Sequence, residues 1–150
     1  MDKAEIIKQL HQARPEHVKW VQEGRKIIKG LSEDKIQRPQ QCVACNFSIW
    51  YETEGYKLVN IPHLSELQEL HHEIHTAYTS LFFTTFDRRK KARSTIISGD
   101  VEIPIDELPF RRKKLKILEN KTIKFLKALL VIEKKVEAMD EAVFDNGWLV

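Results

Sequence analysis

Hydrophobic residues recur every three or four positions along most of the chain, which is the spacing of one face of an α-helix. No segment shows the strict alternation of apolar and polar residues that is typical of a half-buried β-strand. The pattern therefore predicts an all-α protein. Three long helices and a shorter one, joined mostly by short links, favour an antiparallel four-helix bundle with a short extra helix or irregular connection.

The first predicted helix spans about residues 3–29. We expect Pro15 to kink or split it, because proline has no backbone N–H to donate, and we expect Gly30 to end it. Its apolar face is predicted to consist of Ile6, Leu10, Ala13, His17, Trp20, Val21, Gly24, Ile27 and Ile28.

The second predicted helix is shorter and carries both cysteines of the chain. It is expected to run from Pro39, which is favoured in a first turn, to Glu54. Gly55 follows as a predicted left-handed stop.

The third predicted helix begins between residues 62 and 65, where Ser65 followed by Gln68 has the spacing of a capping box. It is expected to fray near the basic run 88–93, before an irregular connection over residues 94–109 that contains glycine and proline. Its apolar stripe is Leu67, Leu70, His71, Ile74, His75, Tyr78, Leu81 and Phe82.

The last predicted helix follows Asp106 as N-cap, with Pro109 tolerated in the first turn. Residues 106–143 form this long bundle helix within a single domain that covers residues 1–150. Its seam is Leu115, Leu118, Thr122, Phe125, Leu129, Ile132, Val136, Met139 and Val143.

Composition narrows the class of protein. With 42% hydrophobic and 31% charged residues, the chain has the balance of an ordinary soluble domain. The charged N-terminal segment lacks the apolar core of a signal peptide, and no run approaches the roughly 20 apolar residues that span a bilayer. We therefore expect a cytoplasmic protein without membrane insertion, and a net charge of +3 is too small to indicate nucleic-acid binding.

Three of the six histidines lie in the segment LHHEIHTAY. His71 and His75 are four residues apart and share a helix face, so that both imidazoles can reach one metal ion, whereas His72 points elsewhere. Paired histidines also occur as ordinary surface or core residues, so this pair alone is weak evidence for a metal site.

His17 and Cys45 change the meaning of that pair. One thiol and three imidazoles from three helices provide the ligand count of a closed tetrahedral zinc site. Thiolate and imidazole together favour Zn²⁺ over Mg²⁺ or Ca²⁺. A metal would also satisfy several polar atoms that the core would otherwise bury without partners.

These residues resemble the chemoreceptor zinc-binding (CZB) domain of bacterial chemoreceptors and diguanylate cyclases. That pattern is a histidine followed three residues later by an aromatic residue, then a Cys-x-hydrophobic-Gly-x-Trp box, then HxxxH. The matching residues over about 10–85 are His17 with Trp20, Cys45 with Phe47 and Trp50, and His71 with His75.

Two positions depart from the family pattern. Ser48 stands where the family usually has glycine in the cysteine box. Cys42 is an extra thiol one turn before Cys45, and it could be a redox partner after oxidation, an alternate ligand or a small buried hydrophobic residue.

The resemblance implies a regulatory sensor of zinc, or of oxidants such as hypochlorous acid, in bacterial chemotaxis or cyclic-di-GMP signalling. Family members often form homodimers beside an output module, so we expect a stand-alone member acting as a homodimer or through a separate chemoreceptor or diguanylate cyclase. Four protein ligands leave no open coordination position, so we expect no enzymatic activity.

Three other hypotheses compete with the sensor. The first is a thiol redox protein that uses Cys42 and Cys45, although thioredoxin-like motifs follow a strand. The second is a purely structural zinc bundle that acts as an interaction adaptor. The third is a di-iron bundle, which would need core carboxylates, and Glu73 lies off the His71 and His75 face.

Two surface features have no assigned role. The basic runs 88–93 and 111–116 could bind an acidic partner, anionic lipid or nucleic acid, but solvated helix ends are the favoured interpretation. The C-terminal tail, residues 144–150, is expected either to pack on the bundle or to contact a partner.

Overall fold

The computed structural model describes residues 1–86 and 106–145, which contain helices and no strand. The α-helices are α1 (Lys3–Ile28), α2 (Asn46–Thr53), α3 (Leu64–Phe86) and α5 (Leu108–Ala138). Four 3₁₀-helices complete the described elements: η1 (Glu33–Lys35), η2 (Cys42–Ala44), η3 (Gly55–Leu58) and η4 (Glu141–Phe144).

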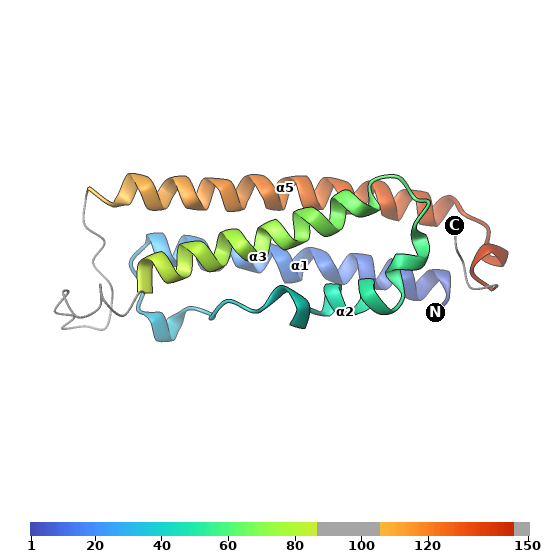
Figure 1. The fold of residues 1–150 in the computed structure, drawn as a ribbon, viewed down its shortest axis with the longest axis horizontal. Coiled ribbons are helices and arrows are strands. Elements are labelled where there is room, and N and C mark those ends of the chain that lie inside the picture. The colour runs from blue at the N-terminus through green and yellow to red at the C-terminus, as the bar shows by residue number, and fades with distance from the viewer. Residues whose placement is uncertain (87–105, 146–150) are drawn as a thin grey trace.

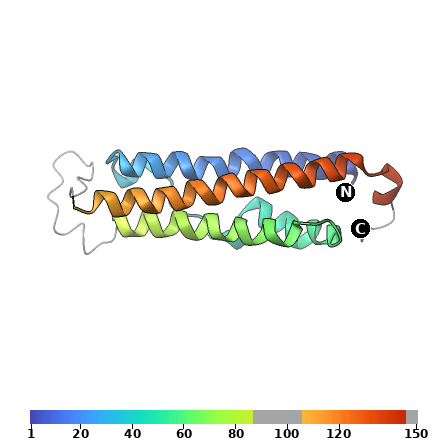
Figure 2. The same ribbon diagram turned by 90° about the horizontal axis from the view of Figure 1, so that it is seen from above.

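The helices form an up-down-up-down bundle (Figure 1). Both α1 and α3 run in one direction, whereas α2 and α5 run in the other, and α5 packs against both α1 and α3. Figure 2 shows the same elongated arrangement from above. The predicted antiparallel four-helix bundle is therefore confirmed, with a fourth corner that α2 fills along only part of the length.

Helix α1 is continuous across Pro15, so the prediction that this proline splits the helix was wrong. Leu10 before the proline and Trp20 after it are both buried, so the buried face of the helix continues past the proline. Asp2 caps the helix in a capping box, and Gly30 follows its end with a φ of 86°.

The second predicted helix is much shorter than expected. Residues 39–45 are not α-helical: η2 occupies part of them, and Cys45 has an extended backbone before α2 begins. The physical reason lies in α3, because the carbonyl of Gln40 accepts a hydrogen bond from His75 Nδ1 at 3.1 Å, and the carbonyl of Gln37 accepts one from Tyr78 Oη at 2.5 Å. These carbonyls bind α3 side chains instead of amides of their own segment.

Gly55 is not a left-handed stop, because Gly30 is the only described glycine with positive φ. It is needed for another reason: a Cβ at this position would lie 2.8 Å from Cζ3 of Trp50. The glycine therefore permits the indole ring to pack against the chain that leaves α2.

The starts of the later helices also differ from the predictions. Ser65 lies inside α3, so it is not an N-cap, and the residue before the helix, His63, has a φ of 73°. Glu107 rather than Asp106 occupies the N-cap of α5, with proline in the first turn as expected. Residues 87–105 and 146–150, which include the first basic run and most of the tail, lie outside the described residues.

The second basic run is only partly solvated. Arg111 is 3% exposed, and its guanidinium donates to Thr85 Oγ1 at 2.6 Å and to Glu107 Oε2 at 2.7 Å. The prediction of a solvated helix end was therefore wrong for this residue, because α3 supplies a hydroxyl partner that local sequence does not reveal.

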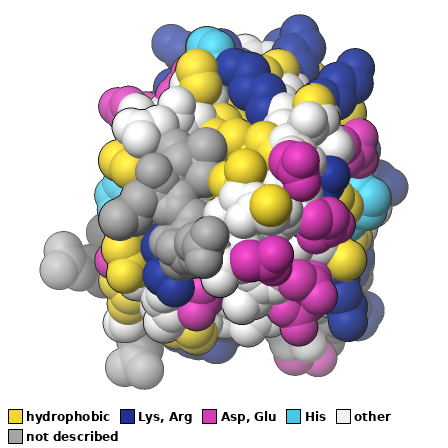
Figure 3. Space-filling model, turned by 90° about the vertical axis from the view of Figure 1, so that its right-hand side faces the viewer, with side chains coloured by type: hydrophobic (Ala, Val, Ile, Leu, Met, Phe, Trp, Pro, Cys, Tyr) yellow, Lys and Arg dark blue, Asp and Glu magenta, His cyan; other side chains and the backbone are white. Residues whose placement is uncertain are grey.

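Charged side chains are unevenly distributed over one end of the bundle. Figure 3 looks onto the end near the N-terminus, where acidic side chains gather over one side and Lys and Arg over another. Phe144 of η4 is buried at this part of the molecule, so the beginning of the predicted tail packs on the bundle. None of the helices in the described ranges has the length and apolar character required to cross a bilayer.

Candidate metal centre

His17 projects from the middle of α1 into the core and has no exposed surface. Its Nδ1 lies 2.7 Å from the carbonyl oxygen of Ala13, one turn earlier. A carbonyl can only accept, so Nδ1 carries the proton and donates it. The unprotonated Nε2 is thereby directed to the bundle interior, 3.6 Å from Cys45 Sγ.

His71 and His75 lie one turn apart on the buried face of α3, as their spacing predicts. Their Nε2 atoms are 3.1 Å apart. His75 Nδ1 donates to the Gln40 carbonyl, so its Nε2 is also a bare acceptor that faces the interior. His72 is exposed, in agreement with the prediction that it points elsewhere.

Cys45 reaches the same point from the fourth corner of the bundle. Cys45 is the residue between η2 and α2, and its backbone is extended. This conformation directs the thiol inward, and the residue is 4% exposed. Burial raises the pKa of the Cys45 thiol, and the backbone N–H groups of Phe47 and Ser48 act in the opposite direction. A positively charged metal would strengthen this opposing effect and hold the sulfur as thiolate.

The four predicted ligands meet in space. Each of His17, Cys45, His71 and His75 is buried and offers one ligand atom, and these atoms all lie within 4.8 Å of one another. Zn–N bonds of about 2.0–2.1 Å and a Zn–S bond of about 2.3 Å place tetrahedral donors about 3.3–3.7 Å apart. The 3.1 Å and 3.6 Å contacts are close to such edges, and no pair of donors is more than 4.8 Å apart. Side-chain shifts of about an ångström would bring all four donors onto one zinc ion.

The protonation of the cluster also favours a cation. Burial lowers the pKa of His17 to about 4 and that of His71 to about 2, and it lowers the pKa of His75 as well. The three imidazoles are therefore neutral at pH 7, which is the form that binds metal. Without a cation, Nε2 of His17 has, among the described residues, only the Cys45 thiol within reach, at 3.6 Å. Within the same described ranges, Nε2 of His75 has only Nε2 of His71, at 3.1 Å.

Aromatic rings form the wall of the cluster. The ring of Phe125 on α5 lies 4.8 Å from that of His17, and the ring of Phe47 lies 4.7 Å from that of His71, measured between centroids. Trp20 packs against His75 at 6.0 Å. Helix α5 contributes none of the four candidate ligands, but Phe125 excludes water from one side of the cluster. The position of Phe125 in the predicted apolar seam did not reveal this role.

Cys42 and Ser48 lie just outside the cluster. Cys42 Sγ is 3.4 Å from His71 Nδ1 and 3.6 Å from Ser48 Oγ. The two cysteine sulfurs therefore contact different histidines, and both thiols are free. Sequence reasoning noted both residues as departures from the family pattern but had no signal that they would contact each other and His71.

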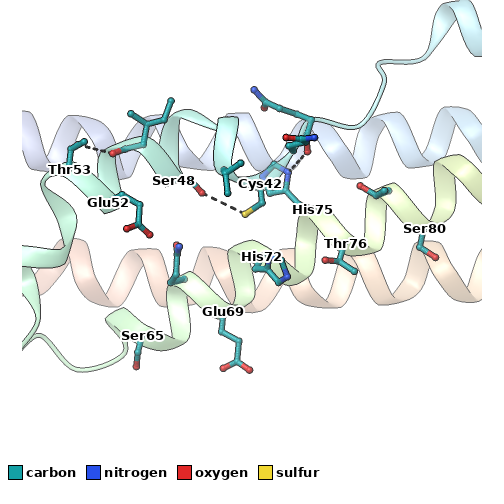
Figure 4. A pocket seen from close by; sticks show the side chains of 16 residues that line it. Cys42, Ser48, Glu52, Thr53, Ser65, Glu69, His72, His75, Thr76 and Ser80 are labelled. Carbon is teal, nitrogen blue, oxygen red and sulfur yellow. Dashed lines mark hydrogen bonds between the residues drawn. The ribbon is translucent and has the colours of Figure 1, made fainter.

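A groove of about 1210 Å³ leads from the surface to this side of the cluster. It runs between α3 and the segment that holds η2 and α2. Figure 4 shows Cys42 and Ser48 facing each other, with His75 drawn beside Cys42. Cys42 is partly exposed here, whereas Cys45 is buried. The groove gives small molecules a route toward the outer side of the cluster.

Comparison with known proteins agrees with this geometry. Residues 17–81 match the family model of the chemoreceptor zinc-binding domain. No curated protein and no solved structure gives a significant match. The family match and the three-histidine, one-cysteine cluster together imply zinc binding. Residues 17–81, which contain all four candidate ligands, are therefore similar to the chemoreceptor zinc-binding domain family.

Proposed function

We propose that this protein is a regulatory zinc-binding module in bacterial signalling, of the chemotaxis or cyclic-di-GMP type, and not an enzyme. The supporting observation is the convergence of four buried donors from α1, the η2–α2 turn and α3. Four protein ligands complete a tetrahedral zinc site, so water has no open position to be activated. Zinc would supply charge and a structural crosslink to this site.

Cys45 is the ligand through which the site would signal. It is the only ligand carried by a short segment, since α2 has 8 residues whereas α1 and α3 have 26 and 23. A helix of that length is not stable alone, so its position depends on packing and on the Cys45 bond to zinc. Loss of zinc, or oxidation of the thiolate to sulfenic acid, would release this segment from the bundle.

The response would pass to another chain. We propose a cytoplasmic homodimer, or a complex with a separate chemoreceptor or diguanylate cyclase, as the partner arrangement. Such a partner would detect the change in zinc occupancy as a change in the surface of α2 and of the adjoining groove. Sedimentation of the zinc-loaded and chelated protein tests the homodimer directly.

Metal content of the purified protein tests the zinc site. We expect one zinc per chain in the wild type and none in Cys45→Ala or His75→Ala. His72→Ala is a matched control, because this neighbouring histidine is exposed and should leave the zinc content unchanged. Iron in the wild type, or zinc retained in both ligand variants, would contradict the proposal.

A second experiment separates an oxidant sensor from a zinc sensor. The zinc-loaded protein is treated with hypochlorous acid in the presence of a sulfenic-acid trap, and the labelled residue is located by mass spectrometry. A label on Cys45 that accompanies zinc release supports oxidant sensing. Zinc release only with chelator, and no label, supports zinc sensing.

A further inference from the structure

The outer nitrogens of the three histidines have different kinds of partner. His17 Nδ1 and His75 Nδ1 donate to backbone carbonyls, which are fixed acceptors. His71 Nδ1 instead contacts the thiol of Cys42, at 3.4 Å from Sγ. Of the three outer partners, only this one can act either as donor or as acceptor, and only this one is a side chain that chemistry can alter.

Zinc would reverse the direction of that hydrogen bond. Because His75 Nε2 is a bare acceptor 3.1 Å away, the metal-free His71 donates through Nε2, and its Nδ1 then accepts from the Cys42 S–H group. With zinc on Nε2, the proton of His71 must reside on Nδ1. Nδ1–H then donates to the Cys42 sulfur, whose own S–H is free to turn toward Ser48 Oγ at 3.6 Å.

Ser48 makes this reversal possible. The residue is 4% exposed, and its hydroxyl can both accept from and donate to Cys42. A glycine at this position would leave the thiol of the zinc form with no second partner on that side. The two residues that depart from the family pattern therefore act as a pair on one ligand.

We propose that Cys42 is a positioning residue of the zinc centre, which holds His71 in its metal-binding tautomer by accepting the Nδ1–H hydrogen bond. Its place on the groove also makes it the point at which a thiol-directed reagent weakens zinc binding without touching a ligand. This inference rests on the proposed zinc site. Outer hydrogen bonds of this kind change metal affinity by about 10–100-fold.

Zinc affinity of substituted proteins tests the positioning role. We expect Cys42→Ala to bind one zinc per chain with an affinity about 10–100-fold lower than wild type, and Cys42→Ser to recover part of the loss because a hydroxyl also accepts. Val43→Ala is the matched control, since this neighbour in η2 is 76% exposed. The thermal midpoint of each chelated variant is measured alongside, to detect a general packing defect.

The tautomer of His71 gives a readout that a packing role would not change. In long-range ¹H–¹⁵N spectra of the zinc-loaded protein, the Nδ1–H proton of His71 should be protected from exchange in wild type and Cys42→Ser. It should exchange rapidly in Cys42→Ala. The corresponding protons of His17 and His75 should be unchanged, because their acceptors are carbonyls.

Thiol modification tests the route through the groove. The Cys42 sulfur adds across the C=C double bond of N-ethylmaleimide. An S–C bond forms, the thiol proton moves to the adjacent carbon, and nothing is released. With the zinc-loaded wild type, we expect an adduct on Cys42 and faster zinc loss to a chromophoric chelator. Cys42→Ser should show neither effect.

The outcomes separate this inference from the zinc site itself. A wild type that binds one zinc, with a Cys42→Ala variant of equal affinity and equal His71 proton exchange, overturns the positioning role alone. An adduct that forms on Cys42 while zinc loss stays at the untreated rate overturns the proposed route. A wild type that binds no zinc overturns both the function and the inference.

Discussion

Two polar clusters that include buried groups lie within a few turns of each other on α1, and the buried groups are satisfied in different ways. One is the metal centre around His17. The other joins Arg14 to Glu133 of α5, whose carboxylate Oε2 lies 2.6 Å from Arg14 Nη2 and 3.3 Å from His11 Nε2. The second cluster contains its own cation, whereas the first contains neutral imidazoles and a thiol. Only the first needs an ion from solution.

The remaining defects of the two clusters also differ. Glu133 Oε1 is buried without a hydrogen-bond partner among the described residues, so the ion pair is incompletely satisfied. In the metal centre, the bare Nε2 atoms of His17 and His75 face one shared point. A single unpaired oxygen is a stability cost, whereas several acceptors converging on one point are a binding site.

Removal of zinc should have the largest effect and affects the metal centre only. A ligand that binds the native state alone, at about 1,000 times its Kd, contributes about 4 kcal/mol to the free energy of unfolding. We therefore expect chelation to lower that free energy by about this amount, as measured by urea denaturation with and without zinc. Equal stability in both conditions would contradict the contrast between the clusters.

Glu133→Ala should break the other cluster with a smaller effect. Loss of a hydrogen bond to a charged group costs about 1.5–3 kcal/mol, and here Arg14 can partly recover its loss from water because its side chain is 35% exposed. Denaturation of the zinc-loaded protein measures the cost. Zinc content should stay at one per chain, and a loss of zinc would show that the two clusters are coupled.

Acid should lower the free energy of unfolding of the zinc-free protein over a defined pH range. The folded pKa of His17 is lowered to about 4 from 6.5, so the unfolded chain binds the proton more readily. The stability that depends on neutral His17 is present above pH 6.5 and is lost as the pH falls toward 4. At about pH 5.5 this amounts to about 1 kcal/mol, and a free energy of unfolding that is flat over this window would contradict the burial of a neutral His17.

His72→Ala should have the smallest effect of the set. The residue lies between His71 and the turn that holds His75, but it is exposed and belongs to neither cluster. We expect a change within about 0.5 kcal/mol in the free energy of unfolding. A larger change would mean that the wall of the groove supports the metal centre more strongly than its contacts indicate.

The fold and the three histidine ligands could be predicted from the sequence because both depend on the spacing of residues within helices. The separation of His71 and His75 fixes their common face, and the apolar stripe of α1 fixes the direction of His17. Cys45 could not be derived this way, because its position comes from an extended turn. It was found by its resemblance to a known family pattern.

Two of the mispredicted features depend on partners distant in sequence. Residues 39–45 do not form an α-helix because α3 side chains hold the carbonyl of Gln40 and that of Gln37, just before the segment. Arg111 is buried because Thr85 of α3 accepts its hydrogen bond. Contacts across 26 to 41 residues leave no periodic signal in the local sequence, so no pattern could reveal them.

The order of the elements along the chain has a consequence for how the protein is made. All four donors lie before residue 76, whereas Phe125, the ring that closes one side of the cluster, belongs to the last long helix. During synthesis the three imidazoles and the thiol emerge from the ribosome well before α5. Zinc can therefore meet an open, half-built bundle, and the docking of α5 then becomes the step that traps it.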